Sequence, residues 1–207
     1  MKENKNHWYD GIFYDKVIAP NQDKSFAIVK NIIGENSAVV DVGCGTGRFS
    51  FSIVDKVKLV HGVDLSERNI AVAKSKLAER NSGKINFYHT DVNKFFKSEN
   101  RHYNYAVMSY VIHEIDEELR VNILKTLSRY ADKVILIDYL HPRPKTFWSG
   151  LNEVVEFVAG REHYSNFKSY LTGGGIKGLA KKSELNIVQE IQNLPSTSHI
   201  VVLEKPV

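Results

Sequence analysis

Hydrophobic and polar positions along this chain follow two different periods. Short, nearly continuous apolar runs recur at intervals, and turn-forming or charged residues separate them. Elsewhere, apolar residues recur every third or fourth position, as Ile70, Ala73 and Leu77 do. The first pattern is typical of buried strands and the second of amphipathic helices, so the chain is predicted to alternate between them. The predicted strands are residues 39–42, 58–66, 84–92, 104–115, 132–140, 186–193 and 198–204.

The helical spacing predicts several helices between these strands. Ser66 and Asp116 are the expected N-caps of two of them, because their side-chain oxygens can accept from the first free backbone N–H groups. The last two strands are joined through the short segment LPSTS, which predicts an antiparallel hairpin. The predicted helices are residues 21–33, 48–56, 67–80, 148–159 and a segment that begins after Asp116 and ends near Arg129.

The stretch from 141 to 183 departs from this regular alternation. Two prolines in HPRPKTF interrupt the pattern before the helix of 148–159. GREHYSNFKSYL predicts a further helical turn. TGGGIKGLAKK is expected to contain flexible glycines, with Lys177, Lys181 and Lys182 on a solvated helix face, rather than a phosphate loop, because no strand precedes its glycines. The apolar stripe expected on the first of these helices consists of Trp148, Leu151, Val155 and Val158.

Composition narrows the class of protein. A chain of 207 residues with 43% hydrophobic and 25% charged residues suits one globular domain. Its net charge of +4 is mildly basic and fits a lysine-rich solvated face. The single cysteine, Cys44, excludes an intrachain disulfide and a two-cysteine metal site, and no metal is expected. Without a signal-like start or a bilayer-length apolar run, the chain is expected to be cytoplasmic and soluble.

The most informative segment is VVDVGCGTGRFS, residues 39–50. An apolar run carries Asp41 and breaks into Gly43, Gly45 and Gly47, and a helical pattern begins at Arg48. Glycines at a strand-to-helix turn let the backbone approach a ligand closely. The spacing G-x-G-x-G differs from the dinucleotide fingerprint G-x-G-x-x-G, and no Walker phosphate loop occurs in the chain.

An acid followed by G-x-G-x-G resembles motif I of the class I S-adenosylmethionine-dependent methyltransferases. The resemblance extends over the whole chain, although only motif I is specific by itself. It implies an α/β fold, a doubly wound seven-stranded, mostly parallel sheet with a reversed last strand. It also implies one domain over residues 1–207, with an N-terminal lid at about 1–33 and a helical insertion at about 141–183 over the acceptor. The implied cofactor is S-adenosylmethionine, with S-adenosylhomocysteine as product.

Acids at the ends of three successive predicted strands strengthen the resemblance. Asp64 follows the glycine loop by about 20 residues, where such folds bind a ribose hydroxyl pair, a feature that NAD sites share. In the resembled family, an acid at the position of Asp91 accepts from the adenine amino group, and the backbone of Val92 meets the ring. The expected cofactor-binding residues are Asp41, Gly43, Cys44, Gly45, Gly47, Asp64, Leu65, Asp91, Val92, Ser109, Tyr110 and Tyr14.

The fourth predicted strand ends where this family faces the transferable methyl group. Its sequence lacks the [DNS]-P-P-[YF] motif and the Pro-Cys nucleophile of other family members. A base is needed for an acceptor of high pKa, and the candidates are His113, His163 and Glu114. His113 and Glu114 are neighbours, so on a strand or a helix they diverge and are not expected to act as a pair. A structural role for His113 is the open alternative.

The expected function is methyl transfer to a small-molecule acceptor, including hydrophobic or lipid-like ones. The expected substrate-binding residues are Tyr9, His163, Tyr164, Phe167 and Tyr170, with core packing as the alternative for these aromatics. Three other functions remain open: an RNA methyltransferase, a non-catalytic protein that binds the cofactor or RNA, and an NAD(P)-dependent oxidoreductase. No nucleic-acid partner is expected, because no RNA-binding module is recognisable, and the sequence gives no oligomeric state.

Overall fold

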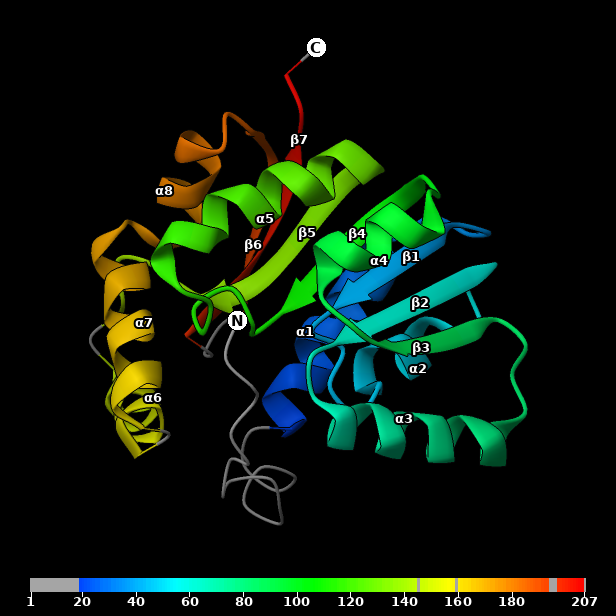
Figure 1. Cartoon of the computed structure of the whole chain (residues 1–207). Coiled ribbons are helices and arrows are strands. Elements are labelled where there is room, and N and C mark those ends of the chain that lie inside the picture. Colours follow the sequence, from blue (N-terminus) through cyan, green and yellow to red (C-terminus); the bar gives the residue numbers. More distant parts are fainter. Residues whose placement is uncertain (1–18, 145, 159, 194–196, 207) are drawn as a thin grey trace.

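The computed structural model describes residues 19–144, 146–158, 160–193 and 197–206 (Figure 1). The described strands form one seven-stranded sheet in the order β3-β2-β1-β4-β5-β7-β6. The first five strands in the chain are parallel, and β7 runs antiparallel to both β5 and β6. The predicted α/β fold with a reversed last strand is therefore confirmed. The strands are β1 Ala38–Val42, β2 Leu59–Asp64, β3 Ile85–His89, β4 Tyr103–Ser109, β5 Ala131–Tyr139, β6 Asn186–Gln192 and β7 Ser198–Glu204.

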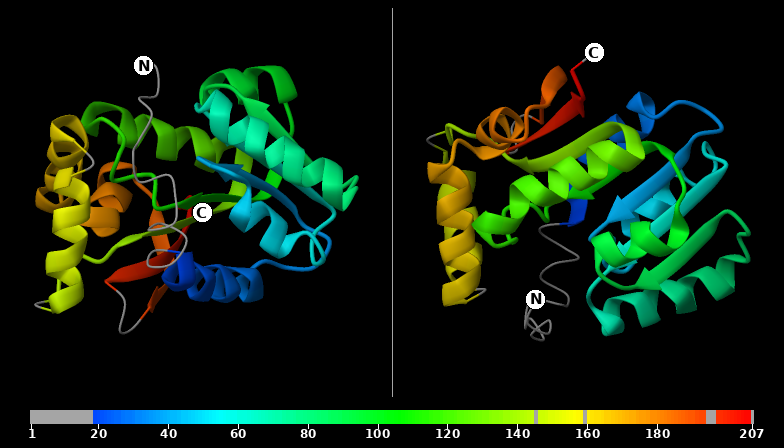
Figure 2. Two further views of the ribbon diagram at one scale, coloured as in Figure 1. Left: turned by 90° about the horizontal axis from the view of Figure 1, so that it is seen from below. Right: turned by 45° about the horizontal axis from the view of Figure 1, so that its top comes forward.

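Helices cover both faces of the sheet (Figure 1). One face packs against α1 Ala19–Ile32, α2 Arg48–Ile53 and α3 Glu67–Arg80. The other packs against α4 Val92–Glu99, α5 Glu117–Tyr130, α7 Arg161–Thr172 and α8 Gly175–Lys182. The remaining helix, α6 Phe147–Val158, packs beside α7, and the pair stands next to the sheet in both views of Figure 2.

Alternate residues of the central strands divide the core into two layers. In β5, Val134 and Leu136 face α5 and α8, whereas Ile135 and Ile137 face the α1 side. All four of these side chains are buried. A strand covered on both faces has a continuous apolar sequence, which is why the apolar runs predicted the central strands.

Several predicted boundaries differ from the structure. β4 ends at Ser109 rather than at residue 115, because Tyr110 adopts a left-handed conformation with φ of 56° and the chain turns. The helix α4 was not predicted: its Phe95 and Phe96 are buried under the sheet. The segment expected to have flexible glycines forms α8, whose Ile176 and Leu179 pack into the core, while its lysines lie on an exposed helix face as predicted.

The helix predicted at 148–159 occurs as α6, but its predicted apolar stripe is partly wrong. Val158 is exposed, together with Val154 and Phe157, while Glu156 is buried. The acid occupies a buried position because it is paired with histidines, as described below. A buried carboxylate is stable only with such partners.

Candidate active site

The glycine loop joins β1 to α2 and contains three residues with positive φ, namely 72° at Gly43, 52° at Gly45 and 79° at Gly47. A Cβ at Gly43 would lie 2.5 Å from Val111, and one at Gly47 would lie 2.5 Å from the Phe87 ring. A Cβ at Gly45 would meet no atom within 4 Å. Two glycines therefore permit close packing, and Gly45 leaves the backbone open to a ligand.

Asp64 at the end of β2 holds this loop. Its Oδ2 accepts from the backbone N–H of Gly45 at 2.8 Å, and its Oδ1 accepts from Ser66 at 2.7 Å. Burial raises the pKa of Asp64, and the nearby charge of Glu114 adds to the effect. Each carboxylate oxygen can accept more than one hydrogen bond, so Asp64 retains acceptor capacity toward hydroxyl groups.

Asp41 lies in the interior below the loop rather than at its surface. Its Oδ2 accepts from Ser50 Oγ of α2 at 2.6 Å, and burial raises its pKa to about 7. Burial also raises the pKa of the Cys44 thiol, which therefore stays protonated at neutral pH. Both residues support the loop from behind, and we infer that Asp41 acts on a ligand through the position of the loop.

The acid at the end of β3 is a helix cap. Asp91 Oδ1 accepts from the backbone N–H groups of Asn93 and Lys94 at 2.9 and 3.2 Å, which caps α4. Val92 is buried, whereas Leu65, which follows the end of β2, is 47% exposed. An exposed leucine beside Asp64 offers an apolar contact to a flat ring at this edge of the sheet.

The end of β4 presents two further predicted residues. Ser109 Oγ is buried and has no hydrogen-bond partner among the described residues. Tyr110 is held in its left-handed conformation by its N–H, which donates to Ile137 O at 2.7 Å. Its hydroxyl lies 3.1 Å from Ser25 Oγ of α1 and donates to Ser198 Oγ of β7 at 3.0 Å. A non-glycine residue at positive φ is strained, and such strain concentrates at functional sites.

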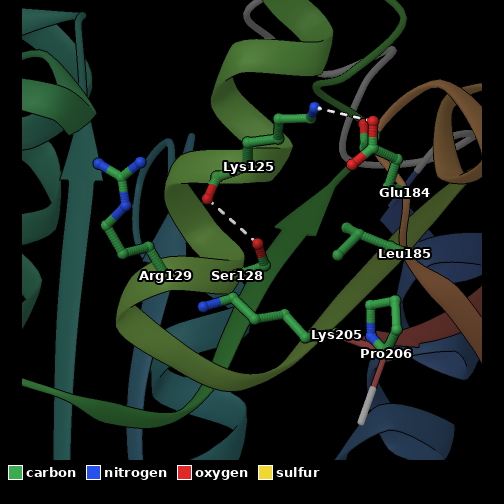
Figure 3. Close-up of a pocket in the computed structure, with 8 residues that line it drawn as sticks. Lys125, Ser128, Arg129, Glu184, Leu185, Lys205 and Pro206 are labelled. Carbon is green, nitrogen blue, oxygen red and sulfur yellow. Dashed lines mark hydrogen bonds and ion pairs between the residues drawn. The ribbon is translucent and has the colours of Figure 1, made fainter.

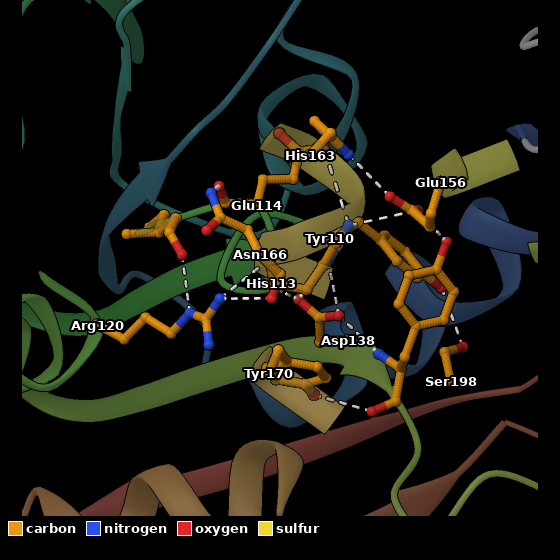
Figure 4. A network of polar contacts seen from close by, with 12 residues as sticks. Tyr110, His113, Glu114, Arg120, Asp138, Glu156, His163, Asn166, Tyr170 and Ser198 are labelled. Atoms are coloured by element: carbon orange, nitrogen blue, oxygen red, sulfur yellow. Dashed lines mark hydrogen bonds and ion pairs between the residues drawn. The ribbon is translucent and has the colours of Figure 1, made fainter. Parts of the chain in front are cut away.

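A buried imidazole–carboxylate network begins directly after this strand (Figure 4). His113 Nδ1 lies 2.8 and 3.0 Å from the two carboxylate oxygens of Asp138 at the end of β5. His113 Nε2 lies 3.5 Å from Glu156 Oε1 of α6 and 3.9 Å from Glu114 Oε1. Both His113 and Asp138 are buried. The network therefore joins the turn after β4 to β5 and to α6.

The second imidazole of the network comes from α7. His163 Nδ1 lies 2.9 Å from Glu156 Oε2, and its Nε2 lies 3.3 Å from Glu114 Oε1. Tyr139 of β5 donates its hydroxyl to Glu156 Oε1 at 2.8 Å. Glu156 is thus the group through which α6 contacts both histidines. Glu114 is the most exposed member, with 41% of its side chain accessible, so it is the acid that faces solvent or a ligand.

The histidines and carboxylates of the network stabilise each other's charged forms. Burial alone lowers the pKa of His113, but Asp138 and Glu156 outweigh it and hold that pKa well above its ordinary value. Burial likewise opposes the protonation of His163, yet Glu114 and Glu156 raise its pKa to about 9. The pKa of Glu156 is lowered against the effect of burial, mainly by the charge of His113. At neutral pH both imidazoles are therefore cations paired with carboxylates.

Arg120 of α5 fixes the turn that carries His113 and Glu114. Its guanidinium donates to the backbone oxygens of Ile115 at 2.8 Å and Asn166 at 2.6 Å. Asn166 Nδ2 in turn donates to Glu114 O at 2.9 Å. These bonds tie the turn to α7, so the two predicted residues from the β4–α5 turn and His163 from α7 are brought together.

The prediction that His113 and Glu114 diverge is wrong. They lie on an irregular turn rather than on a strand or helix, and both approach His163. Of the predicted acceptor residues, Phe167 and Tyr170 are buried in the core, and the Tyr170 hydroxyl donates to Tyr139 O. Tyr164 donates to Glu153 of α6 at 2.9 Å. The predicted Tyr9 and Tyr14 lie outside the described residues.

Sequence reasoning missed three members of the network: Asp138, Tyr139 and Glu156. A signal existed for two of them. Asp138 interrupts the apolar run ILIDYL near the end of a strand, as Asp41, Asp64 and Asp91 do for theirs. Glu156 is the one acid in the apolar segment VVEFV. An isolated acid in an apolar segment indicates a buried carboxylate with a partner.

A separate cavity of about 350 Å³ lies at the opposite edge of the sheet (Figure 3). It is formed by the end of α5, the turn between α8 and β6, and the residues after β7. Lys125 forms an ion pair with Glu184 there at 3.6 Å, and Ser128 donates to Lys125 O. None of the predicted site residues lines this cavity. In open α/β sheets ligands bind at the carboxyl ends of the strands. The edge of the sheet that carries the His113 network is therefore the better candidate for the ligand-binding site.

The described residues lack two features, a metal-binding group and a membrane-spanning helix. They contain no group of three histidine, cysteine, aspartate or glutamate side chains positioned to hold a metal ion. Among the same residues, no helix has the length and apolar character needed to cross a membrane.

Comparison with known proteins finds a family match over part of the chain. Residues 39–133, from β1 to the start of β5, match the family described as "Methyltransferase domain". Ninety residues are 34% identical to "Putative methyltransferase GWCH70_2453" of Geobacillus sp. (strain WCH70). That match covers 42% of this chain and 35% of the relative, so the chain spans about a third of the length of the curated relative it matches.

Solved structures share the fold over nearly the whole chain. Magnesium protoporphyrin IX methyltransferase of Synechocystis PCC 6803, with bound SAM, superposes with a TM-score of 0.66 and 17% identity, over 96% of this chain and 88% of that one. The PH0226 protein of Pyrococcus horikoshii OT3 gives a TM-score of 0.70 at 17% identity, over 98% and 100% of the two chains. At this level of identity the likeness establishes the fold alone.

Proposed function

We propose that the chain is a class I S-adenosylmethionine-dependent methyltransferase, in keeping with its match to the methyltransferase domain family, and that it transfers a methyl group from S-adenosylmethionine to a small-molecule acceptor. The observation that carries the proposal is the contact between the glycine loop and the turn that leads to the His113 network. Val111 packs on Gly43 of the open loop, and two residues later His113 begins the buried network. A cofactor on the loop and an acceptor beside the network are therefore neighbours.

The residues around the loop fit this cofactor. Ser109 Oγ, which has no hydrogen-bond partner in the described part of the chain, offers a hydrogen bond. Gly45 leaves the backbone open, and Asp64 has acceptor capacity for ribose hydroxyls. Leu65 gives an apolar surface for the adenine ring next to Asp64. When bound, S-adenosylmethionine supplies a methyl group already activated by a sulfonium. The protein then contributes mainly proximity and orientation.

The acceptor is proposed to bind under α6 and α7, which lie between β5 and β6 in the chain. Glu114 and His163 are the groups that face it, and His113 positions them from behind. The exposed Val154, Phe157 and Val158 on α6 favour an acceptor with hydrophobic or lipid-like parts. The proteins with this fold do not select one acceptor, since one is named for magnesium protoporphyrin IX and another for ribosomal protein L11.

Calorimetric titration tests the cofactor first. S-adenosylmethionine and S-adenosylhomocysteine are titrated into the wild type and into Asp64→Ala, with NADH as the control. Micromolar binding of both sulfur compounds that is lost in Asp64→Ala supports the proposal. Binding of NADH alone would favour an oxidoreductase instead.

Acceptor class is tested by separating methyl transfer from RNA binding. We expect label from methyl-labelled S-adenosylmethionine to appear in small molecules and not in RNA. Salt-sensitive RNA binding together with labelled RNA would replace the small-molecule acceptor by RNA. RNA binding with no transfer to any acceptor would indicate a non-catalytic protein.

A further inference from the structure

Each imidazole of the network has carboxylates at both of its ring nitrogens. His113 has Asp138 at Nδ1, and Glu156 and Glu114 at Nε2. His163 has Glu156 at Nδ1 and Glu114 at Nε2. An ionised carboxylate can only accept hydrogen bonds, so Nδ1 of each imidazole carries a proton. The carboxylate oxygens 3.5 Å from His113 Nε2 and 3.3 Å from His163 Nε2 favour a proton on those nitrogens as well. The geometry thus favours two imidazolium cations rather than a free imidazole base.

Together with Asp64 and Arg120, the network has four carboxylates and three cations, which leaves one negative charge in excess. The carboxylates are Asp138, Glu156, Glu114 and Asp64, and the pKa of Asp64 is raised by burial and further by the charge of Glu114. The cations are His113, His163 and Arg120, and Arg120 donates to backbone oxygens on the far side of the turn. Among described neighbours, Arg143 is already paired with Glu153 at 2.9 Å.

Resting on the proposed function, we propose that the acceptor atom is the nitrogen of an amine, so that the product carries a positive charge. The nitrogen lone pair forms the new bond to the methyl carbon as the carbon–sulfur bond breaks, and that bond's electron pair stays on sulfur. The positive charge moves from sulfur to nitrogen. An excess of fixed negative charge beside the acceptor stabilises this developing cation.

The same network disfavours methyl transfer to hydroxyl groups and to anionic acceptors. An aliphatic hydroxyl has to lose its proton, and both imidazoles are already protonated, while a carboxylate such as Glu114 is too weak a base for it. A carboxylate or phenolate acceptor is an anion, which the excess negative charge repels. An amine that arrives as an ammonium ion gives its proton to the bulk solvent before transfer, so that its lone pair is free and Glu114 stays ionised.

Binding of charged and uncharged isosteres tests the inference. Choline, its uncharged isostere 3,3-dimethylbutan-1-ol and the anion 3,3-dimethylbutanoate are titrated calorimetrically into protein saturated with S-adenosylhomocysteine. We expect choline to bind about tenfold or more tightly than the alcohol, which is 1.4 kcal/mol, and the anion to bind weakest. Equal affinities, a preference for the alcohol or anion, or no binding of any of the three overturns the inference.

Two variants assign the preference to the network. Glu114→Gln removes the exposed acid and is expected to abolish the preference for choline. Glu79→Gln removes the same charge from an exposed position on α3 and is expected to leave the preference intact. Equal effects of both variants would mean that overall charge, and not this site, selects the cation.

Transfer is then compared on one skeleton, with 2-phenylethylamine, 2-phenylethanol and 3-phenylpropanoate as acceptors for labelled methyl groups. Label on the amine alone supports the inference, and label on the alcohol or acid overturns it. If none is labelled, the isostere titration decides. Binding of S-adenosylhomocysteine distinguishes the two claims: if it binds without cation preference only the inference fails, whereas if it does not bind the proposed function fails.

Discussion

His113 Nδ1 and Asp138 Oδ1 lie 2.8 Å apart, and both side chains are buried. The two residues come from neighbouring strand ends, because β4 and β5 pair in parallel and the turn after β4 folds back over β5. Asp138 also accepts from the backbone N–H of Tyr139. The pair therefore holds the turn after β4, which carries His113 and Glu114, against the end of β5.

Asp138→Ala is expected to destabilise the protein by about 3–5 kcal/mol, because it leaves the imidazolium of His113 buried beside fewer anions. Chemical denaturation monitored by circular dichroism measures the change. Asp55→Ala is the control, since Asp55 forms an exposed ion pair with Lys30 and is expected to cost about 1 kcal/mol or less. Similar losses in the two variants would contradict a strong buried pair.

The network predicts that stability falls at alkaline pH. The folded-state pKa of His163 is raised to about 9 from 6.5, so its contribution is complete below about pH 6.5 and is lost as pH rises through 9. Glu156 has a lowered pKa, so its contribution is present above 4.5 and is lost only in stronger acid. Melting temperatures between pH 6 and 10 measure this. His163→Gln is expected to flatten the alkaline decline, and an unchanged slope would contradict the assignment.

Two glycine substitutions are expected to separate folding from ligand binding. Gly43→Ala places a Cβ 2.5 Å from Val111 at a φ of 72°, and it is expected to cost about 2 kcal/mol or more of stability. Gly45→Ala meets no atom within 4 Å, so only the cost of positive φ, about 1–2 kcal/mol, applies. Affinity for S-adenosylhomocysteine should nevertheless fall in Gly45→Ala, because its Cβ stands where the backbone is open. Full affinity in that variant would remove the loop from the cofactor site.

Ser109→Ala is expected to leave stability within about 0.5 kcal/mol of the wild type or to raise it, because the hydroxyl is buried without a partner among the described residues. Affinity for S-adenosylhomocysteine is expected to fall roughly tenfold if the cofactor supplies that partner. Ser75→Ala, at an exposed position on α3, is the matched control. A loss of stability without loss of affinity would assign Ser109 to the fold instead.

Local sequence patterns predicted most of the fold, because the signals for strands and helices lie within a few residues. Helix 67–80 and its cap Ser66 agree with the structure, in which Ser66 Oγ accepts from Asn69 N. Asp116 occupies the predicted N-cap of α5, although its side chain makes no capping bond. The main misses were α4 and the end of β4, where a left-handed Tyr110 is stabilised by contacts to Ser25 and Ser198, far away in the chain.

The sequence by itself determined the strand and helix order and the glycine loop, because glycine spacing and apolar period are local properties. It also singled out His113, Glu114 and His163 as candidates for a catalytic base. Only the tertiary structure decided that these three meet, that Asp138 and Glu156 complete the network, and that Asp91 caps a helix. The partners come from β5, α6 and α7, and their distances depend on how those elements pack. The protonation of both histidines follows from that packing, since an imidazole's charge depends on what its two nitrogens face.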